Sequence, residues 1–520
     1  MKKNINFILI ILSIFYCKIC AQNCDIEAEA AYSNLNFIIN NAQKFCEKGD
    51  HVKEKKLAEQ HRGQSEKIER KFKCYSPQAA ISLWRASMHL GEFDEALMYA
   101  HSLAAHCEKF KLLDCSCVGE SKLRTGLVYS AKGDDSLAIV EFKKSLINCP
   151  NNKLIEAFVL MKEGDKEKAS NNLNKASIKY VEALNLLDEF IEVNNGAVHD
   201  FVEFIRGRCY CSKAEILLQQ GECNEALPIF LMALRMAQIN FDAKVIARCY
   251  YNIAHIYCLN SNYLIAAKNF DEAVKVAVKF GYNEIVVDSY NWLAYIKDLT
   301  GDFKQSYDFA VRALEIAKTI QYRIGIADAF NNFSYINRES GDNTALLSNA
   351  KSALALAKDE FYLEGMANAY YNISLYFWQS KHLKDSRAAI KEYSNLMLHA
   401  ALEAQLPNRV IDSYNSLGDI FFIENELDSA TNYFNLALNT SKVCEEKCGR
   451  YLVGIIDAYN GLGLVYKKMR KKDKSATNFY HALVLAEEIQ YVDGIDIAKK
   501  GCEYATSSFP KILESKKTSK

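Results

Sequence analysis

The chain has 520 residues, half of them apolar and 12% aromatic, and its 64 basic and 64 acidic residues balance to no net charge. This composition excludes a disordered chain, and the zero net charge argues against a protein drawn electrostatically to nucleic acid or to an anionic membrane. With five prolines in the whole chain, long uninterrupted helices are favoured, because an interior proline costs a helix about 3 kcal/mol.

The first 21 residues predict a secretory signal peptide. Two lysines precede a mostly apolar run of twelve residues, from Ile5 to Tyr16, and the small residue Ala21 follows. A run of this length is shorter than the roughly 20 residues needed to span a bilayer. We therefore expect cleavage after Ala21 and a secreted or periplasmic protein. The alternative is a membrane anchor formed by an uncleaved N-terminal segment.

Two of the 17 cysteines, Cys17 and Cys20, fall within this leader, which leaves 15 in the mature chain. An exported chain allows disulfides, although a helical array of this size does not depend on them. Cys209 and Cys249 lie 40 residues apart at equivalent positions, so a bridge between them is one candidate. Cys444 and Cys448 are either thiols or a local bridge.

The next segments differ in regularity. Residues 22–75 read as a charged helical entry, and 79–207 as divergent helical units. Residues 208–490 hold seven regular units, 491–507 a C-terminal capping helix, and 508–520 a lysine-rich tail.

The regular units are defined by small residues that recur every 40 to 45 positions: Ala214, Ala254, Ala294, Ser334, Ser374, Gly418 and Gly463. An aromatic residue stands four positions before each of them: Tyr210, Tyr250, Tyr290, Phe330, Tyr370, Tyr414 and Tyr459. A second small position follows twelve residues later in six of the units, and alanine follows nineteen residues later in six. Small residues at fixed places let two helices cross closely, and aromatic residues fill the space beside them.

This pattern resembles the tetratricopeptide repeat, in a longer form of about 40 residues that is similar to the repeats of kinesin light chains and of sensor regions in bacterial signalling proteins. The resemblance is specific from residue 208 onward and diffuse before it. It implies an all-α fold, a right-handed α-solenoid of stacked antiparallel helix pairs. It also implies that the first helix of each pair lines a concave groove.

A polar stripe runs along these first helices, about 130° away from the residues that form the core. Arginine leads the stripe in the first two units, and Asp or Asn leads it in the next five. We predict that it forms a peptide-binding groove, made of Asp288, Asn291, Tyr295, Asp298, Asp328, Asn331, Tyr335, Arg338, Asn368, Trp378, Asp412, Asn415, Asp419, Asp457 and Asn460.

The recurring aspartates allow a second interpretation, in which they complement the helix dipole and cap the helix start. That interpretation does not cover the asparagines, which are mediocre helix formers placed in mid-helix. An asparagine both donates and accepts hydrogen bonds. A solvent-lined ladder of asparagines is therefore expected to pair with the backbone of an extended peptide.

We find no motif that indicates an enzyme, a cofactor or a metal. Gly-rich phosphate loops, GxSxG and HExxH are absent from the sequence. His101 and His106 lie roughly 140° apart around a helix, so they cannot share one ion unaided, and the nearby Cys107, Cys115 and Cys117 do not change that geometry.

The sequence thus favours an exported, non-enzymatic scaffold with a protein or peptide partner and no nucleic acid. The alternative is a ligand- or peptide-sensing component of a bacterial signalling system whose output domain is on another chain.

Overall fold

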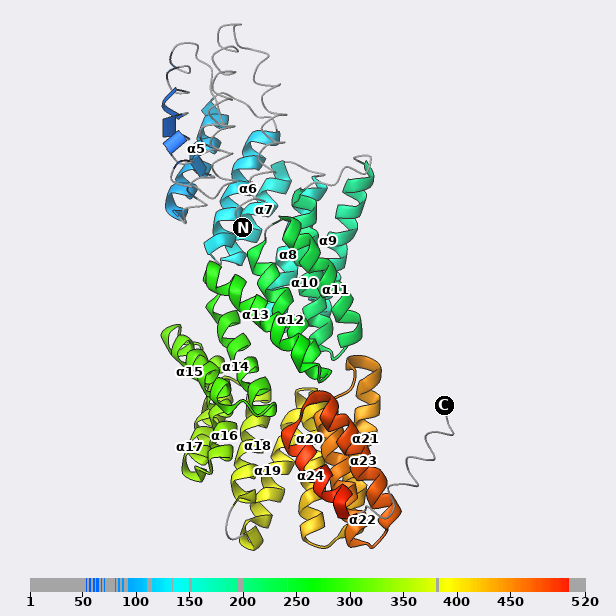
Figure 1. Cartoon of the computed structure of the whole chain (residues 1–520). Coiled ribbons are helices and arrows are strands. Elements are labelled where there is room, and N and C mark those ends of the chain that lie inside the picture. Colours follow the sequence, from blue (N-terminus) through cyan, green and yellow to red (C-terminus); the bar gives the residue numbers. More distant parts are fainter. Residues whose placement is uncertain are drawn as a thin grey trace. The chain divides into compact units, whose positions relative to one another are not determined.

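The computed structural model describes residues 92–504 apart from gaps at 110–114, 133, 149–151, 194–199, 241 and 380–382, together with scattered positions between 53 and 87. The expected leader, most of the charged entry segment and the lysine-rich tail lie outside these residues. Within the described part every regular element is a helix (Figure 1). The predicted all-α solenoid of stacked helix pairs is confirmed.

The helices form two compact units, and the boundary between the units crosses the helices α10, α11 and α12. One unit comprises the described residues up to 216 and residues 231–246. Its helices are α5 (Phe93–Lys109), α6 (Cys115–Lys132), α7 (Asp135–Asn148), α8 (Lys153–Ala169), α9 (Leu173–Val193) and most of α10 (Asp200–Gln219). Its core gathers around the fully buried rings of Trp84, Phe142 and Tyr180.

The second unit comprises residues 217–230 and the described residues from 247 onward. It takes the first part of α11 (Cys223–Asn240) and most of α12 (Ala243–Leu259), followed by α13 (Tyr263–Phe280), α14 (Asn283–Leu299), α15 (Phe303–Thr319), α16 (Arg323–Ser340), α17 (Asn343–Asp359), α18 (Leu363–Trp378), α19 (Leu383–Glu403), α20 (Pro407–Ile423), α21 (Leu427–Cys448), α22 (Leu452–Lys468), α23 (Lys472–Ile489) and α24 (Val492–Tyr504). From α14 to α22, each even-numbered helix opens a pair, and the next helix packs against it.

The recurring small and aromatic residues explain how each pair closes. The ring of Phe479 on α23 lies over Gly463 on α22, where an added Cβ would come within 2.7 Å of it. Ser475 donates its hydroxyl to the carbonyl of Gly463 at 2.8 Å. The small positions therefore bring the two helices of a pair into contact, as the sequence predicted.

The turn between the two helices of a pair is formed by residues that favour it. Gly301 takes a left-handed φ of +79°, which favours glycine, and ends α14. Asp302 follows it and accepts a hydrogen bond from the backbone N–H of Gln305 at 3.2 Å, which caps α15.

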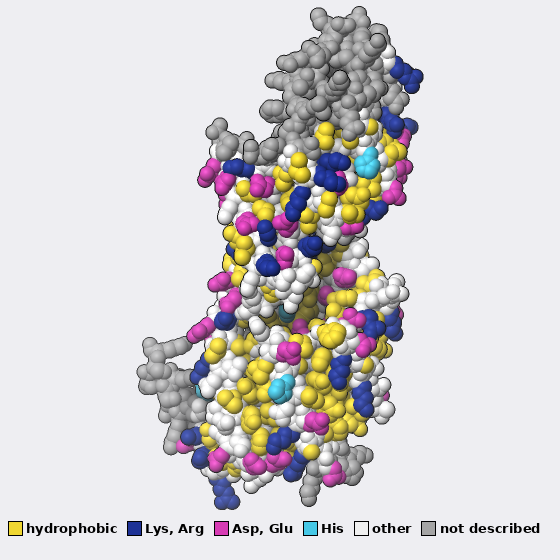
Figure 2. Space-filling model, turned by 180° about the vertical axis from the view of Figure 1, so that it is seen from behind, with side chains coloured by type: hydrophobic (Ala, Val, Ile, Leu, Met, Phe, Trp, Pro, Cys, Tyr) yellow, Lys and Arg dark blue, Asp and Glu magenta, His cyan; other side chains and the backbone are white. Residues whose placement is uncertain are grey.

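On the outside of the molecule, basic and acidic side chains are interspersed over the face seen in Figure 2.

No helix in the described part of the chain is long and apolar enough to cross a bilayer.

Candidate functional site

The first helices of the second unit carry the polar stripe, and the structure places two cavities along them. The larger, about 320 Å³, is walled by residues of α12, α14, α16 and α18, with Arg409 from α20. The smaller, about 50 Å³, is lined by residues from α14 and α16 through to α24. Tyr295, Tyr335 and Arg409 line both cavities. We call the residues that line the two cavities the inner surface.

The structure brings most of the predicted groove residues to this inner surface. The larger cavity is lined by Asp288, Asn291, Tyr295, Asp328, Asn331, Tyr335 and Asn368. The smaller one adds Asp298, Arg338, Asp412 and Asp457. The other predicted residues, Trp378, Asn415, Asp419 and Asn460, do not line either of these two cavities.

The asparagines are buried, and the expectation that they line solvent is wrong. Asn291, Asn331, Asn415 and Asn460 are each at most 5% exposed. Their side-chain amides donate to backbone carbonyls of the next first helix: Asn291 to Gly325 at 3.1 Å, Asn331 to Gly365 at 3.2 Å, Asn415 to Gly454 at 2.8 Å, and Asn460 to Gly494 at 3.2 Å. Each asparagine therefore joins two consecutive repeats.

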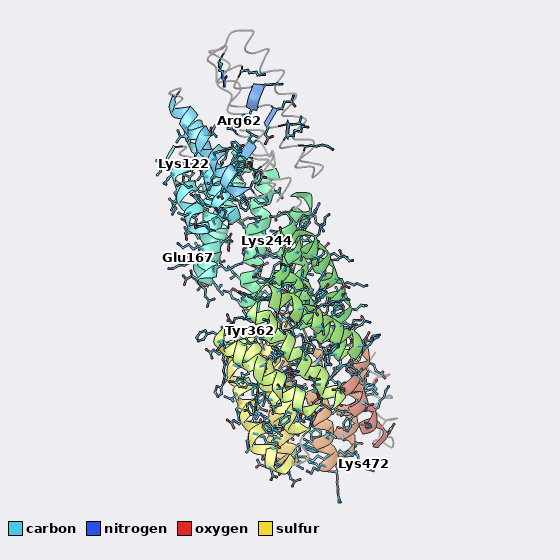
Figure 3. All side chains as sticks on the ribbon, turned by 90° about the vertical axis from the view of Figure 1, so that its left-hand side faces the viewer. Arg62, Lys122, Glu167, Lys244, Tyr362 and Lys472 are labelled. Atoms are coloured by element: carbon cyan, nitrogen blue, oxygen red, sulfur yellow. A yellow bond between two sulfur atoms is a disulfide. The ribbon has the colours of Figure 1, made fainter. Side chains whose placement is uncertain are left out.

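The aspartates make a second link across the same joints. Tyr322 donates its hydroxyl to Asp288 at 3.4 Å, and Tyr362, marked at the start of α18 in Figure 3, donates to Asp328 at 3.2 Å. Tyr451 donates to Asp412 at 3.2 Å in the same way, and Tyr491 forms a hydrogen bond with Asp457. The aspartates therefore do not act as helix caps, since these residues lie well inside their helices.

The two links together define a paired motif, which we call the Asp–Asn latch. A D-x-x-N in one first helix meets a Y-x-x-G at the start of the next one, as YRIG (322–325), YLEG (362–365), YLVG (451–454) and YVDG (491–494). The glycine is required because an added Cβ at Gly454 would collide with Ile411 and Tyr451. Sequence reasoning missed Y-x-x-G, although its period matches that of the repeat.

Two further asparagines extend the latch and were also missed. Asn332 donates to the backbone carbonyl of Asn291 at 3.0 Å, and Asn372 donates to that of Asn331 at 3.2 Å. Both are buried. The joints between α14, α16 and α18 are therefore held by a continuous chain of amides.

The joint between α18 and α20 departs from this pattern. Tyr371 replaces the asparagine, Leu406 the tyrosine, and Arg409 the glycine. Arg409 lines both cavities and donates to Asp412 at 2.8 Å. Arg409 is thus an inner-surface cation that sequence analysis did not single out.

A row of aromatic rings connects the two cavities. It runs through Tyr251, His255, Trp292, Tyr295, Tyr335 and Tyr371, with neighbouring ring centroids 4.8 to 6.4 Å apart. The rings come from four successive first helices, α12, α14, α16 and α18. Rings at this spacing offer a continuous apolar surface flanked by polar groups.

Burial sets the charge state of the acidic groups around the larger cavity. It raises the pKa of Asp288 to about 7, with the neighbouring Glu284 and Glu364 acting in the same direction. Burial, reinforced by Glu364 and Asp288, raises the pKa of Asp328 well above its ordinary range. Burial also lowers the pKa of His255, which favours the neutral ring.

The smaller cavity carries charges of both signs. Arg338 pairs with Asp493 of α24 at 3.3 Å and with Glu339 at 2.6 Å. Asp298 is 7% exposed, and burial raises its pKa to about 6 against the influence of Arg338. One of its carboxylate oxygens is buried without a hydrogen-bond partner.

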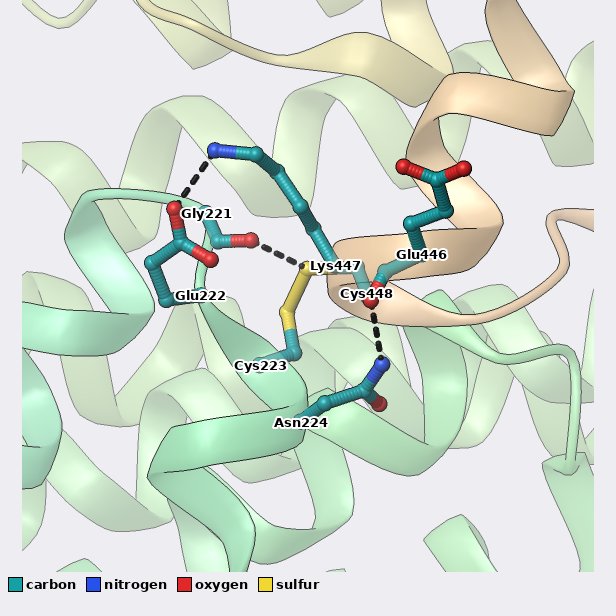
Figure 4. The surroundings of a disulfide bond; sticks show 7 residues. All are labelled: Gly221, Glu222, Cys223, Asn224, Glu446, Lys447 and Cys448. Atoms are coloured by element: carbon teal, nitrogen blue, oxygen red, sulfur yellow. Dashed lines mark hydrogen bonds and ion pairs between the residues drawn. A yellow bond between two sulfur atoms is a disulfide. The ribbon is translucent and has the colours of Figure 1, made fainter.

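A disulfide closes the second unit on itself. It joins Cys223 at the start of α11 to Cys448 at the end of α21, with a Cα–Cα distance of 4.5 Å (Figure 4). Beside it, Asn224 donates to the carbonyl of Glu446 at 2.9 Å, and Lys447 pairs with Glu222. Sequence analysis did not name this pair.

The cysteine pairings that the sequence suggested are not formed. Cys209 and Cys249 are both buried, and no bridge joins them. Cys444 is likewise not bridged to Cys448. Within the described residues no group of three metal-ligating side chains comes together. The side chains of His106, Cys107, Cys115 and Cys117 lie outside the described residues.

No family model and no curated protein sequence matches the chain. Solved structures do. A Rap protein complexed with Competence and Sporulation Factor shares 12% identity at a TM-score of 0.51, covering 71% of this chain and 98% of the Rap chain. The fold is that of a helical repeat solenoid.

Two other solved structures are more distant. The apo quorum sensor NprR from B. thuringiensis shares 15% identity at a TM-score of 0.48, over 70% of this chain and 98% of its own. Yeast Tom70 shares 15% sequence identity at a TM-score of 0.32, and the match covers 88% of this chain and 99% of the Tom70 chain.

Proposed function

We propose that the protein is an exported, non-enzymatic scaffold that holds an extended peptide or protein segment on the inner surface of its second unit. The observation that carries the proposal is the aromatic row between the two cavities. Aromatic rings flanked by a few polar groups are typical of sites that bind small ligands and peptides. The Rap structure with a similar fold was solved with a bound factor, which supports this reading.

The buried asparagines change how such a segment would be held. Each donates one amide N–H to the next repeat and is at most 5% exposed, so these side chains are poorly placed to pair with a peptide backbone. Asn368 is different, because it lines the larger cavity and its buried side-chain oxygen has no hydrogen-bond partner. In our proposal Asn368 accepts a backbone N–H of the segment, while the aromatic row contacts its apolar side chains.

The alternative is a peptide-sensing component of a signalling system, with its output domain on another chain. It uses the same inner surface, and it too draws support from the Rap complex. The two candidates differ in the consequence of binding, since a scaffold retains the segment whereas a sensor passes a signal to the other chain.

The test is to fill the larger cavity. Ile324 lines it, so Ile324→Trp should block it, whereas Leu264→Trp places the same ring on an exposed position of α13 as a matched control. Tagged full-length proteins are purified from the native host, and the bound species are identified by mass spectrometry. Synthetic peptides from each captured sequence are then titrated by fluorescence anisotropy.

Peptides that bind wild type and the Leu264→Trp control, and bind Ile324→Trp at least about tenfold more weakly, would support the proposal; a tenfold change corresponds to roughly 1.4 kcal/mol. Equal binding to all three correctly folded proteins would remove the inner surface from the function.

A further inference from the structure

We propose that the larger cavity receives a positively charged group of the bound segment, a lysine or arginine side chain or a free α-amino group, between Asp288, Asp328 and Glu364. The inference rests on the proposed function, because the charged group belongs to the segment held on the inner surface. It adds the chemistry by which that segment is recognised.

The three carboxyl groups line one cavity from three successive first helices, α14, α16 and α18. Asp288 and Asp328 each receive one hydrogen bond from a tyrosine hydroxyl. Within the described residues none of the three forms an ion pair, and no cationic side chain offsets the burial of Asp288 or Asp328. The cavity therefore gathers acidic groups that lack a countercharge.

The cation and the imidazole that line the same cavity do not provide that countercharge. Arg409 lines the same cavity, but its guanidinium is bound to Asp412 at 2.8 Å. His255 also lines it, and burial favours its neutral form. A cation brought by a ligand would favour the ionised forms of Asp288 and Asp328 and would be held by charge-assisted hydrogen bonds to them.

The walls of the cavity suit a cation as well. The ring of Trp292 lies 4.8 Å from that of His255 and 5.8 Å from that of Tyr295. Indole and phenol faces attract lysine and arginine, more strongly where the cation is shielded from water.

An independent observation also indicates a missing ligand. Tyr335 lines both cavities and is 6% exposed, and its hydroxyl oxygen is buried without a hydrogen-bond partner. The side-chain oxygen of Asn368, a residue that lines the larger cavity, is also buried without a partner. An unpaired buried hydroxyl costs about 1–3 kcal/mol, which an N–H donor from a ligand would recover. An ammonium or guanidinium group carries several such donors.

The experiment offers the full-length protein three pools of octapeptides that differ in where the positive charge lies. In the first, acetylated and amidated peptides carry one lysine or arginine. In the second, norleucine or citrulline replaces that residue. In the third, the peptides have the neutral side chains and a free α-amino group. Peptides retained after size-exclusion chromatography are quantified by mass spectrometry.

We expect at least about tenfold enrichment of the first or the third pool over the second, the effect of one hydrogen bond to a charged group. Which pool is enriched distinguishes a side chain from an α-amino group. Asp328→Asn and Glu364→Gln should each reduce the enrichment by about tenfold. Asn can still accept the Tyr362 hydroxyl, so the fold should be retained. Asp308→Asn, the same change on an exposed position of α15, should have no effect.

Equal retention of all three pools, unaltered in both variants, would overturn the cationic site and leave the proposed peptide binding standing. Retention of no pool would overturn both.

Discussion

Asn331 donates its side-chain amide to the carbonyl oxygen of Gly365 at 3.2 Å, although 34 residues separate the two. The same amide group accepts a hydrogen bond from Asn372 at 3.1 Å. One buried side chain thus fixes the position of α16 against α18. The relationship recurs with Asn291, Asn415 and Asn460. The primary role of these residues is therefore to stabilise the stacking of the repeats.

We expect Asn331→Ala to destabilise the protein by about 1–3 kcal/mol, because Gly365 and Asn372 would lose a buried partner. Asn395→Ala is the matched control: Asn395 is exposed, and its amide bonds to Lys391 of its own helix at 2.8 Å. That change should lie within about 0.5 kcal/mol of wild type. Urea unfolding compares the stability of the two variants. Equal unfolding midpoints would contradict a stabilising role of the latch.

Asp288 should make stability fall as the pH rises. Its pKa is about 7 in the folded protein against 3.8 ordinarily, so between pH 4 and 7 the folded state keeps a proton that the unfolded state has released. The slope due to this group is up to about 1.4 kcal/mol per pH unit. Asp288→Asn cannot ionise, so its stability advantage over wild type should grow from pH 4.5 to pH 7.5.

The difference between Asp288→Asn and wild type is the diagnostic quantity. Burial of neutral His255 gives the opposite slope, with stability lost as the pH falls below its ordinary pKa, and this contribution cancels in the comparison. Parallel curves for the two proteins over that pH range would show that Asp288 is ionised in the folded protein.

The Cys223–Cys448 bridge should appear in a non-reducing peptide map, and its removal should lower stability. For a closed loop of this length we expect a loss of about 2–5 kcal/mol in the double change to serine. Cys444→Ser, one helical turn before Cys448, keeps the bridge and serves as the control for loss of a buried thiol. Full alkylation of Cys223 and Cys448 without a reductant would show that the bridge is absent.

The proposed export has its own test, since the leader should be removed. Intact mass of the protein from the envelope fraction of its host should correspond to a chain that begins at Gln22. A mass that retains Met1 to Ala21 would instead support the anchored alternative.

The repeat architecture could be predicted because helix pairing depends on local spacing. Small residues such as Gly463 and aromatic residues such as Phe479 lie close in sequence, and their contact recurs in each unit. The helical wheel also grouped residues that the structure places along the two cavities, among them Asp288, Tyr295 and Arg338. It could not tell which residues on that face would be covered by the next repeat.

The burial of the asparagines and the disulfide pairing could not be predicted in this way, because both depend on contacts between residues far apart in the sequence. Asn331 is buried because Gly365 lets α18 approach, and this becomes visible once Y-x-x-G is read as the complement of D-x-x-N. The pairing of Cys223 with Cys448 depends on how far the solenoid turns over 225 residues, which local spacing does not determine. Among 15 mature cysteines many other pairings were open.

The latch is incomplete on the last described helix, α24. Repeat interfaces are head-to-tail, so nothing in their symmetry prevents a second molecule from adding to the end. α24 presents Tyr491 and Gly494 to α22, but Ile497 and Lys500 occupy the places where its own Asp and Asn would stand. It accepts a latch and does not offer one. A second molecule that added to this end would therefore have to stack without an Asp–Asn latch.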